Sequence, residues 1–130
     1  MNPLKLSLVR HAHADPAAIL QEDKLRPLSI QGINHINPLG EAMLTLNQLP
    51  EFAIVSSAQR AQETFINLSE RLGINITNET KSGIYEGDLF LILKQIKIAH
   101  KNHNHVAVIG HNPTLSKLAS ILTQKNIVLN

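Results

Sequence analysis

Short apolar runs alternate with longer amphipathic segments along this chain of 130 residues. The runs at 4–9, 52–55 and 106–109 are rich in Val, Ile and Leu and are too short for ordinary helices. Such runs are typical of strands that are buried on both faces of a sheet. The segments between them have apolar residues at helical spacing. This alternation predicts a three-layer α/β/α sandwich with a mainly parallel central sheet.

The helix signals include caps and breaks. Ser29 is a suitable N-cap for a helix that extends to about Leu49. Pro38 and Gly40 interrupt this segment, which predicts a kink or two consecutive helices, the second capped by Asn37. Further helices are predicted over 58–72 with Gly73 as the stop, over 88–100, and from Pro113 or Thr114 to about Thr123.

The remaining segments carry weaker signals. Residues 17–22 are predicted to form a turn of helix within a polar loop, and residues 74–77 a short strand. A loop is expected over 78–87, and residues 127–129 form an edge strand or a tail. Since no internal boundary or repeat interrupts the pattern, we expect a single domain over residues 1–130.

Composition excludes several classes of protein. With 43% hydrophobic residues the chain can bury a sizeable core, and without cysteine it has neither a disulfide framework nor a thiolate metal site. The formal net charge is only +2 and no basic run stands out, which argues against a nucleic-acid partner. No segment resembles a signal peptide or a membrane span, so we expect no membrane partner and a cytoplasmic location.

Charged residues follow the predicted strands directly. Arg10 and His11 come after the first strand, and His111 comes after the strand at 106–109. Ser57 follows the second strand, and Arg60 lies about one helical turn further on. Because ligands bind beyond the carboxyl ends of parallel strands, these side chains are predicted to share one site.

The residue types of this site favour a phosphoryl group over a metal ion. Arginine is always charged, and its guanidinium matches the oxygens of a phosphoryl group. Histidine serves as a nucleophile, an acid or a hydrogen-bond donor. Since the site has neither cysteine nor a group of carboxylates, we expect no metal and no cofactor.

Four motifs in this order resemble those of the histidine phosphatase superfamily, which has the phosphoglycerate mutase-like fold. LVRHA at 8–12 is similar to its Arg-His-Gly motif, with Ala12 in place of Gly, and SSAQRAQET at 56–64 is similar to its second motif. VIGHNP at 108–113 is similar to the motif with the second histidine. RPLS at 26–29, followed by Gly32, resembles the small SixA-type branch, the phosphohistidine phosphatases.

The resemblance implies a covalent mechanism. His11 would attack phosphorus in line and form a phosphohistidine, which water then hydrolyses. Arg10 and Arg60 would bind the equatorial oxygens, and a protonated His111 would donate to the same group. Arg26 would contact the substrate or anchor its loop.

Two further roles stay open. Ser57 would bind the phosphoryl group or cap its helix. A proton donor for the leaving group is expected between the second and third motifs, where Glu86 is the first candidate and Asp88 the second. A phosphohistidine substrate would need no strong acid, because imidazole leaves more readily than an alkoxide.

The expected function is therefore dephosphorylation of phosphohistidine on a protein, such as a phosphotransfer or histidine-kinase component of a signalling relay. Two alternatives are a small-molecule phosphomonoesterase and an inactive module that binds phosphate or a phosphoprotein. A third, a metal carrier, rests on His100, His103 and His105. Relatives usually continue into a further C-terminal strand, which this chain lacks or replaces with residues 126–130.

Overall fold

The centre of the fold is a four-stranded parallel sheet. The computed structural model describes residues 3–123. Its strands are β1 (Lys5–Arg10), β2 (Phe52–Ser56), β3 (Thr77–Lys81) and β4 (His105–Gly110). They lie in the order β1-β4-β2-β3, and each neighbouring pair is parallel. The predicted α/β class with its parallel sheet is confirmed.

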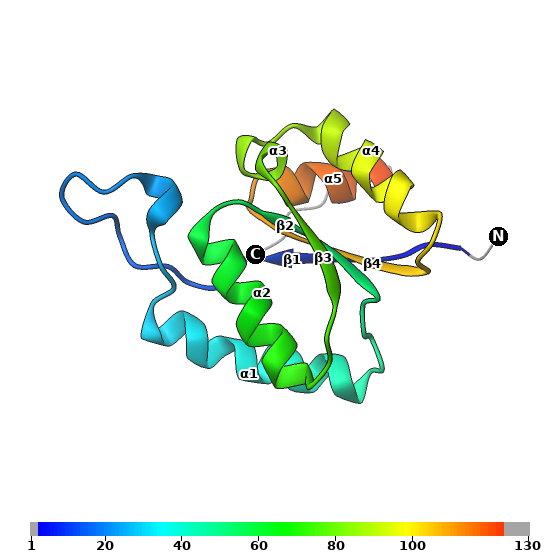
Figure 1. Ribbon diagram of the computed structural model, residues 1–130, viewed down its shortest axis with the longest axis horizontal. Helices are drawn as coiled ribbons and strands as arrows, with labels where there is room; N and C mark the ends of the chain where they lie inside the picture. Colours follow the sequence, from blue (N-terminus) through cyan, green and yellow to red (C-terminus); the bar gives the residue numbers. More distant parts are fainter. Residues whose placement is uncertain (1–2, 124–130) are drawn as a thin grey trace.

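Helices cover both faces of the sheet (Figure 1). One face carries α1 (Ile30–Thr45) and α2 (Gln59–Leu72). The other carries α3 (Ser82–Glu86), α4 (Leu89–His100) and α5 (Thr114–Thr123). Among these described helices, none combines the length and the apolar character needed to cross a membrane.

The central strands β2 and β4 explain the continuous apolar runs of the sequence. Ala53 and Val55 of β2 face the core under α1 and α2, whereas Ile54 faces the core under α4 and α5. Successive side chains of a strand point to opposite faces, so a strand buried on both faces is apolar along most of its length. All residues of β2 and β4 are buried.

Caps fix the limits of three helices, and two of these caps, Ser29 and Gly73, were predicted from the sequence. Ser29 accepts a hydrogen bond from Gly32 N (2.9 Å) at the start of α1. Asp88 accepts one from Leu91 N (3.1 Å) at the start of α4. Gly73 ends α2 with φ +69°, a left-handed conformation that glycine adopts without a steric penalty.

The prediction for the first helix is partly wrong. α1 is one helix with Pro38 in its interior, not two consecutive helices, and it ends at Thr45 rather than near Leu49. Its buried residues Ile36, Gly40 and Met43 lie on one face at helical spacing. Pro38 is exposed, so the carbonyl that loses its N–H partner lies on the solvent side, where water can satisfy it.

The prediction for residues 74–87 is also wrong. The strand begins at Thr77, later than expected, and the expected loop is occupied by β3 and α3. The β3 sequence TNETK contains no apolar residue because this edge strand exposes most of its side chains. Its place in the sheet comes from backbone pairing with β2, which periodicity cannot reveal.

The loop between β1 and α1 extends beyond the end of the sheet (Figure 1). The turn of helix predicted over 17–22 is absent. The loop instead contains a 3₁₀ turn at Asp23–Leu25. Residues 127–129, for which an edge strand or tail was predicted, lie outside the described residues.

Candidate active site

The carboxyl ends of β1 and β4 bring the two predicted histidines together. Arg10 pairs with Gly110 in the sheet, and His11 N donates to Gly110 O (3.0 Å). His11 and His111 directly follow these strand ends, and their ring centroids lie 5.1 Å apart. The parallel register therefore places both imidazoles at one edge of the sheet.

A pocket of about 370 Å³ opens beside His11. Three of the predicted site residues, Arg10, His11 and Arg26, line it together with Ala12, His13 and Ala14. Arg10 is exposed and Arg26 is partly exposed, so both guanidinium groups are within reach of solvent. The pocket has room for a tetrahedral oxyanion and two positive charges to attract it.

The hydrogen bond of His11 leaves one ring nitrogen for chemistry. Nδ1–H donates to the carbonyl oxygen of Ala12 (2.7 Å), so the neutral ring carries its lone pair on Nε2. Burial is the main cause that lowers the pKa of His11, and the charges of Arg60, Arg10 and Arg26 lower it further against the raising effect of the Ala12 bond. His11 is thus a neutral imidazole at neutral pH, which is the form that a nucleophile requires.

His111 is also neutral in the free protein. Its Nε2 lies 2.7 Å from Ser56 Oγ, and Nδ1 is buried without a partner among residues 3–123. Burial lowers the pKa of His111 to about 4, and the charges of His11, Arg60 and Arg10 add to this effect, while Asp23 opposes it. The protonated form that the sequence predicted therefore needs the negative charge of a bound phosphoryl group.

The lowered pKa of His111 predicts that the protein loses stability in mild acid. An unfolded chain titrates this histidine near 6.5, whereas the folded protein titrates it at about 4, so protons bind the unfolded chain more readily. The contribution of neutral His111 to the stability of the folded protein is complete above pH 6.5 and is lost as the pH falls toward 4. By about pH 5 the loss is at most about 2 kcal/mol.

Urea unfolding at about pH 7.5 and about pH 5 measures this loss. The matched variant is His111→Asn, which cannot titrate but keeps a polar side chain. We expect a smaller loss of stability in the variant than in the wild type, because His11 and His105, whose pKa values burial also lowers, contribute to both proteins. Equal losses in the two proteins would contradict the prediction.

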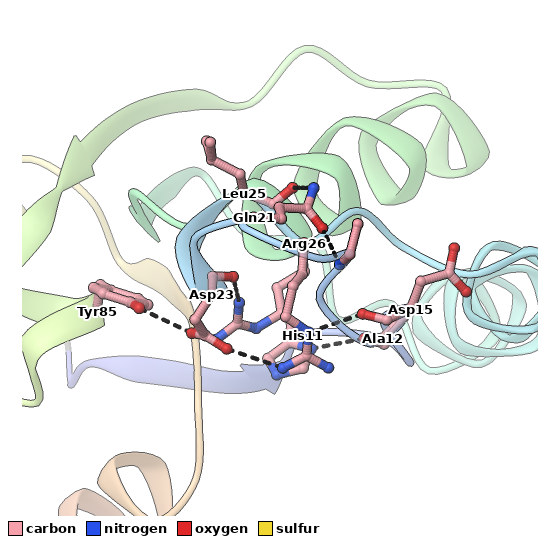
Figure 2. Close-up of polar contacts among 10 residues, drawn as sticks. His11, Ala12, Asp15, Gln21, Asp23, Leu25, Arg26 and Tyr85 are labelled. Atoms are coloured by element: carbon pink, nitrogen blue, oxygen red, sulfur yellow. Dashed lines mark hydrogen bonds and ion pairs between the residues drawn. The ribbon is translucent and has the colours of Figure 1, made fainter.

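Arg60 lies near the start of α2 and is buried, with only 7% of its surface exposed. Its Nη1 donates to the main-chain oxygen of Asp23 (2.9 Å), and its Nη2 donates to Asp23 Oδ2 (3.0 Å). The same carboxylate accepts from Arg26 Nη1 (3.0 Å) and from Tyr85 OH (2.8 Å), as Figure 2 shows. These bonds, that of Tyr85 first, lower the pKa of Asp23 to about 2.

The segment expected to hold the proton donor contributes a different side chain. The ring of Tyr85 meets the ring of His111 edge-on at 5.8 Å, and Arg60 Cζ lies 5.8 Å from the Tyr85 ring. Glu86 is exposed at the end of α3, and Asp88 caps α4. A proton-donating role for Glu86 remains a prediction.

Several contacts hold the loop after His11 against α1 and α2. Ala12 N donates to Thr64 Oγ1 (3.0 Å), and Ser29 N donates to His13 O (2.9 Å). A Cβ at Gly32 would lie 2.1 Å from His13 O, so only glycine lets α1 approach this closely. The RPLS segment and Gly32 thus shape the pocket by positioning its loop.

Two alternative readings of the sequence are not supported. Ser57 is not the helix cap, because the N-cap of α2 is Ala58, and Ser57 Oγ is buried without a partner among the described residues. The histidines on which the metal-carrier alternative rests make other contacts, since His103 stacks on Phe52 and His105 bonds to Ser7 Oγ (2.7 Å). Within residues 3–123, no group of three or more His, Cys, Asp or Glu side chains is placed to hold a metal ion.

The structure resembles those of solved phosphatases, although no protein-family model and no curated protein matches the chain. It is similar to the protein histidine phosphatase SixA complexed with tungstate, with a TM-score of 0.86 and 21% identity over 96% of this chain and 81% of that one. For the SixA protein from Agrobacterium tumefaciens the TM-score is 0.84 and the identity is 23%, over 93% of this chain and 77% of that one. For a mycobacterial glucosyl-3-phosphoglycerate phosphatase the TM-score is 0.62 and the identity is 14%, over 94% of this chain and 80% of that one.

The similar structures agree with the arrangement of elements described above. Each of the three covers more than nine-tenths of this chain. The chain therefore has the phosphoglycerate mutase-like α/β/α fold of the histidine phosphatases.

Proposed function

We propose that the protein hydrolyses phosphoryl groups through a phosphohistidine on His11, and that its substrate is phosphohistidine on a protein. The observation that carries this proposal is the state of His11. Its neutral Nε2 lies at the end of β1, where the charges of Arg10, Arg26 and Arg60 all act on the ring. This combination of a neutral nucleophile and cationic neighbours suits attack on an anionic phosphoryl group.

The mechanism follows from these groups. The oxygens of the phosphoryl group bind to the arginines, and their negative charge raises the pKa of His111 so that it can donate a hydrogen bond. His11 Nε2 then attacks phosphorus in line, the bond from phosphorus to the leaving nitrogen breaks, and the substrate ring, protonated on its other nitrogen, leaves as neutral imidazole. Water hydrolyses the new phosphorus–nitrogen bond on His11, which releases inorganic phosphate and regenerates the imidazole.

The surroundings of the leaving group favour phosphohistidine over an alkyl ester. Of the two acids predicted to donate a proton, Glu86 is exposed and Asp88 holds the start of α4. An alkoxide needs a well-placed acid, whereas imidazole leaves without one. A small-molecule ester is the second candidate, because one similar structure is a glucosyl-3-phosphoglycerate phosphatase.

Phosphate release from two substrates tests the proposal. One is an isolated phosphotransfer domain phosphorylated on histidine, and the other is para-nitrophenyl phosphate. Faster turnover of the phosphohistidine domain supports a protein phosphohistidine phosphatase that acts on a relay component. Turnover of the aryl ester alone supports the small-molecule enzyme, and binding of inorganic phosphate without turnover of either substrate supports an inactive binding module.

A further inference from the structure

Asp23 binds the arginines that the proposed mechanism assigns to the phosphoryl group. We propose that the Asp23 carboxylate is an internal competitor for the phosphoryl group, which must displace it to bind and which it helps to expel after hydrolysis. This inference rests on the proposed function and adds a residue that sets anion affinity and product release at the same site.

The contacts of the carboxylate resemble those of a bound anion. Oδ1 accepts from Arg26 Nη1, and Oδ2 accepts from both Arg60 Nη2 and Tyr85 OH. Three donors, two of them charged, therefore converge on one carboxylate (Figure 2). Charge-assisted bonds from arginine are those that phosphoryl oxygens form most readily, so carboxylate and phosphoryl group compete for the same donors.

Asp23 is the more exposed partner in this contact. The side chain of Arg60 is 8% exposed, whereas that of Asp23 is 52% exposed and belongs to a 3₁₀ turn without buried residues. Rotation of the Asp23 side chain into solvent therefore disturbs no packing. Arg60 stays fixed meanwhile, because its Nη1 also binds the main-chain oxygen of Asp23.

The competitor leaves part of Arg60 unused. Asp23 binds the two terminal nitrogens, while the buried Nε has no partner among the described residues. A carboxylate offers two oxygens and one charge, whereas a phosphoryl group offers three oxygens and more charge. The exchange therefore favours a phosphoryl group over weaker anions, which gain too little to displace Asp23.

A merely positioning role of Asp23 would have the opposite effect. If the carboxylate served to orient Arg60 and Arg26 for the substrate, its removal would weaken phosphate binding. If it competes, its removal strengthens phosphate binding. The sign of the change in affinity thus separates the two roles.

Calorimetric titration with inorganic phosphate at fixed pH and ionic strength provides the test. We expect Asp23→Asn to bind phosphate roughly tenfold more tightly than the wild type, as for the loss of a competing charge-assisted bond. Tyr85→Phe removes one donor to Asp23 without changing a charge, so it should bind phosphate a few-fold more tightly. The control Glu22→Gln makes the same charge change on the neighbouring, exposed residue and should alter the affinity by less than about twofold.

Product inhibition by phosphate should strengthen in Asp23→Asn by the same factor. Unchanged or weaker phosphate binding in Asp23→Asn, with a wild type that binds phosphate, would overturn the competition and leave the proposed function intact. Should Asp23→Asn not fold, an unchanged affinity in Tyr85→Phe would overturn it equally. Absence of phosphate binding in the wild type and all variants would instead refute the site and the proposed function.

Discussion

His11→Ala is expected to lower kcat on a phosphohistidine protein by about 10⁴-fold or more. The variant removes the only protein atom that forms a bond to phosphorus in the proposed mechanism. The arginines and His111 remain, but they bind and neutralise the phosphoryl group without providing a covalent route. Stability should change little, because His11 is only partly buried and its burial already disfavours the charged form.

Two measurements check this prediction. Phosphate release gives kcat for the wild type and the variant. After reaction with a ³²P-phosphorylated substrate, the acid stability of the label on the enzyme shows whether the modified residue is a histidine, because phosphohistidine is acid-labile. Label on a histidine in the wild type, absent from His11→Ala, is the expected result. The matched control is His35→Ala, an exposed histidine on α1, which should keep full activity. Retention of more than about a tenth of the wild-type kcat in His11→Ala would refute the covalent mechanism.

The central part of the fold could be predicted because burial leaves a pattern in the sequence. Except for Ser56 and His105 at strand ends, β2 and β4 are apolar since both of their faces are covered, and α2 shows its apolar stripe before Gly73. β3 has no such pattern, because an edge strand with exposed side chains is held by backbone pairing alone. In α1, tertiary packing of the face around Ile36 and Met43 outweighs the local preference of Pro38 to end a helix.

The part of the candidate site that lies at strand ends could also be predicted from the sequence. Arg10 ends β1, His11 and His111 directly follow strands, and parallel pairing alone brings such residues to one edge of the sheet. Asp23 and Tyr85 were not predicted as site residues, because their contact spans 62 positions and joins an irregular loop to a short helix. Tyr85 is the one tyrosine of the sequence, and it lies beside Glu86, but the carboxylates of this segment were expected to donate the proton in preference to the phenol.

The electrostatics of the site depend on burial, which the sequence does not encode locally. A buried Arg60 and a His111 with a pKa of about 4 follow from the packing of α2 and α3 around the sheet end. The sequence led us to expect a protonated His111, which is the state that fits the bound anion. The structure shows that the free protein holds the ring neutral, so binding and protonation must be linked.

Arg60→Ala should lower kcat/KM for the phosphohistidine protein by about 10³-fold, because a buried arginine aimed at an anion contributes far more than an exposed one. Arg60→Lys should recover little of this loss, since an ammonium group cannot replace the planar guanidinium. The pKa values of His11 and His111 should both rise in Arg60→Ala, because the charge of Arg60 lowers each of them in the wild type. Titration of the imidazole resonances by NMR measures this second effect without any substrate.

The control for this experiment lies on the same helix. Arg71 is near the end of α2, where it lies 3.8 Å from Glu41 and away from the pocket. Arg71→Ala should leave kcat/KM and both histidine pKa values unchanged, which separates loss of the site charge from general damage to α2. If Arg60→Ala kept kcat/KM within about tenfold of the wild type while the histidine pKa values rose, Arg60 would tune the imidazoles but not bind the phosphoryl group. Arg10 and Arg26 would then carry that binding, and Asp23 would compete with the phosphoryl group only through its bond to Arg26.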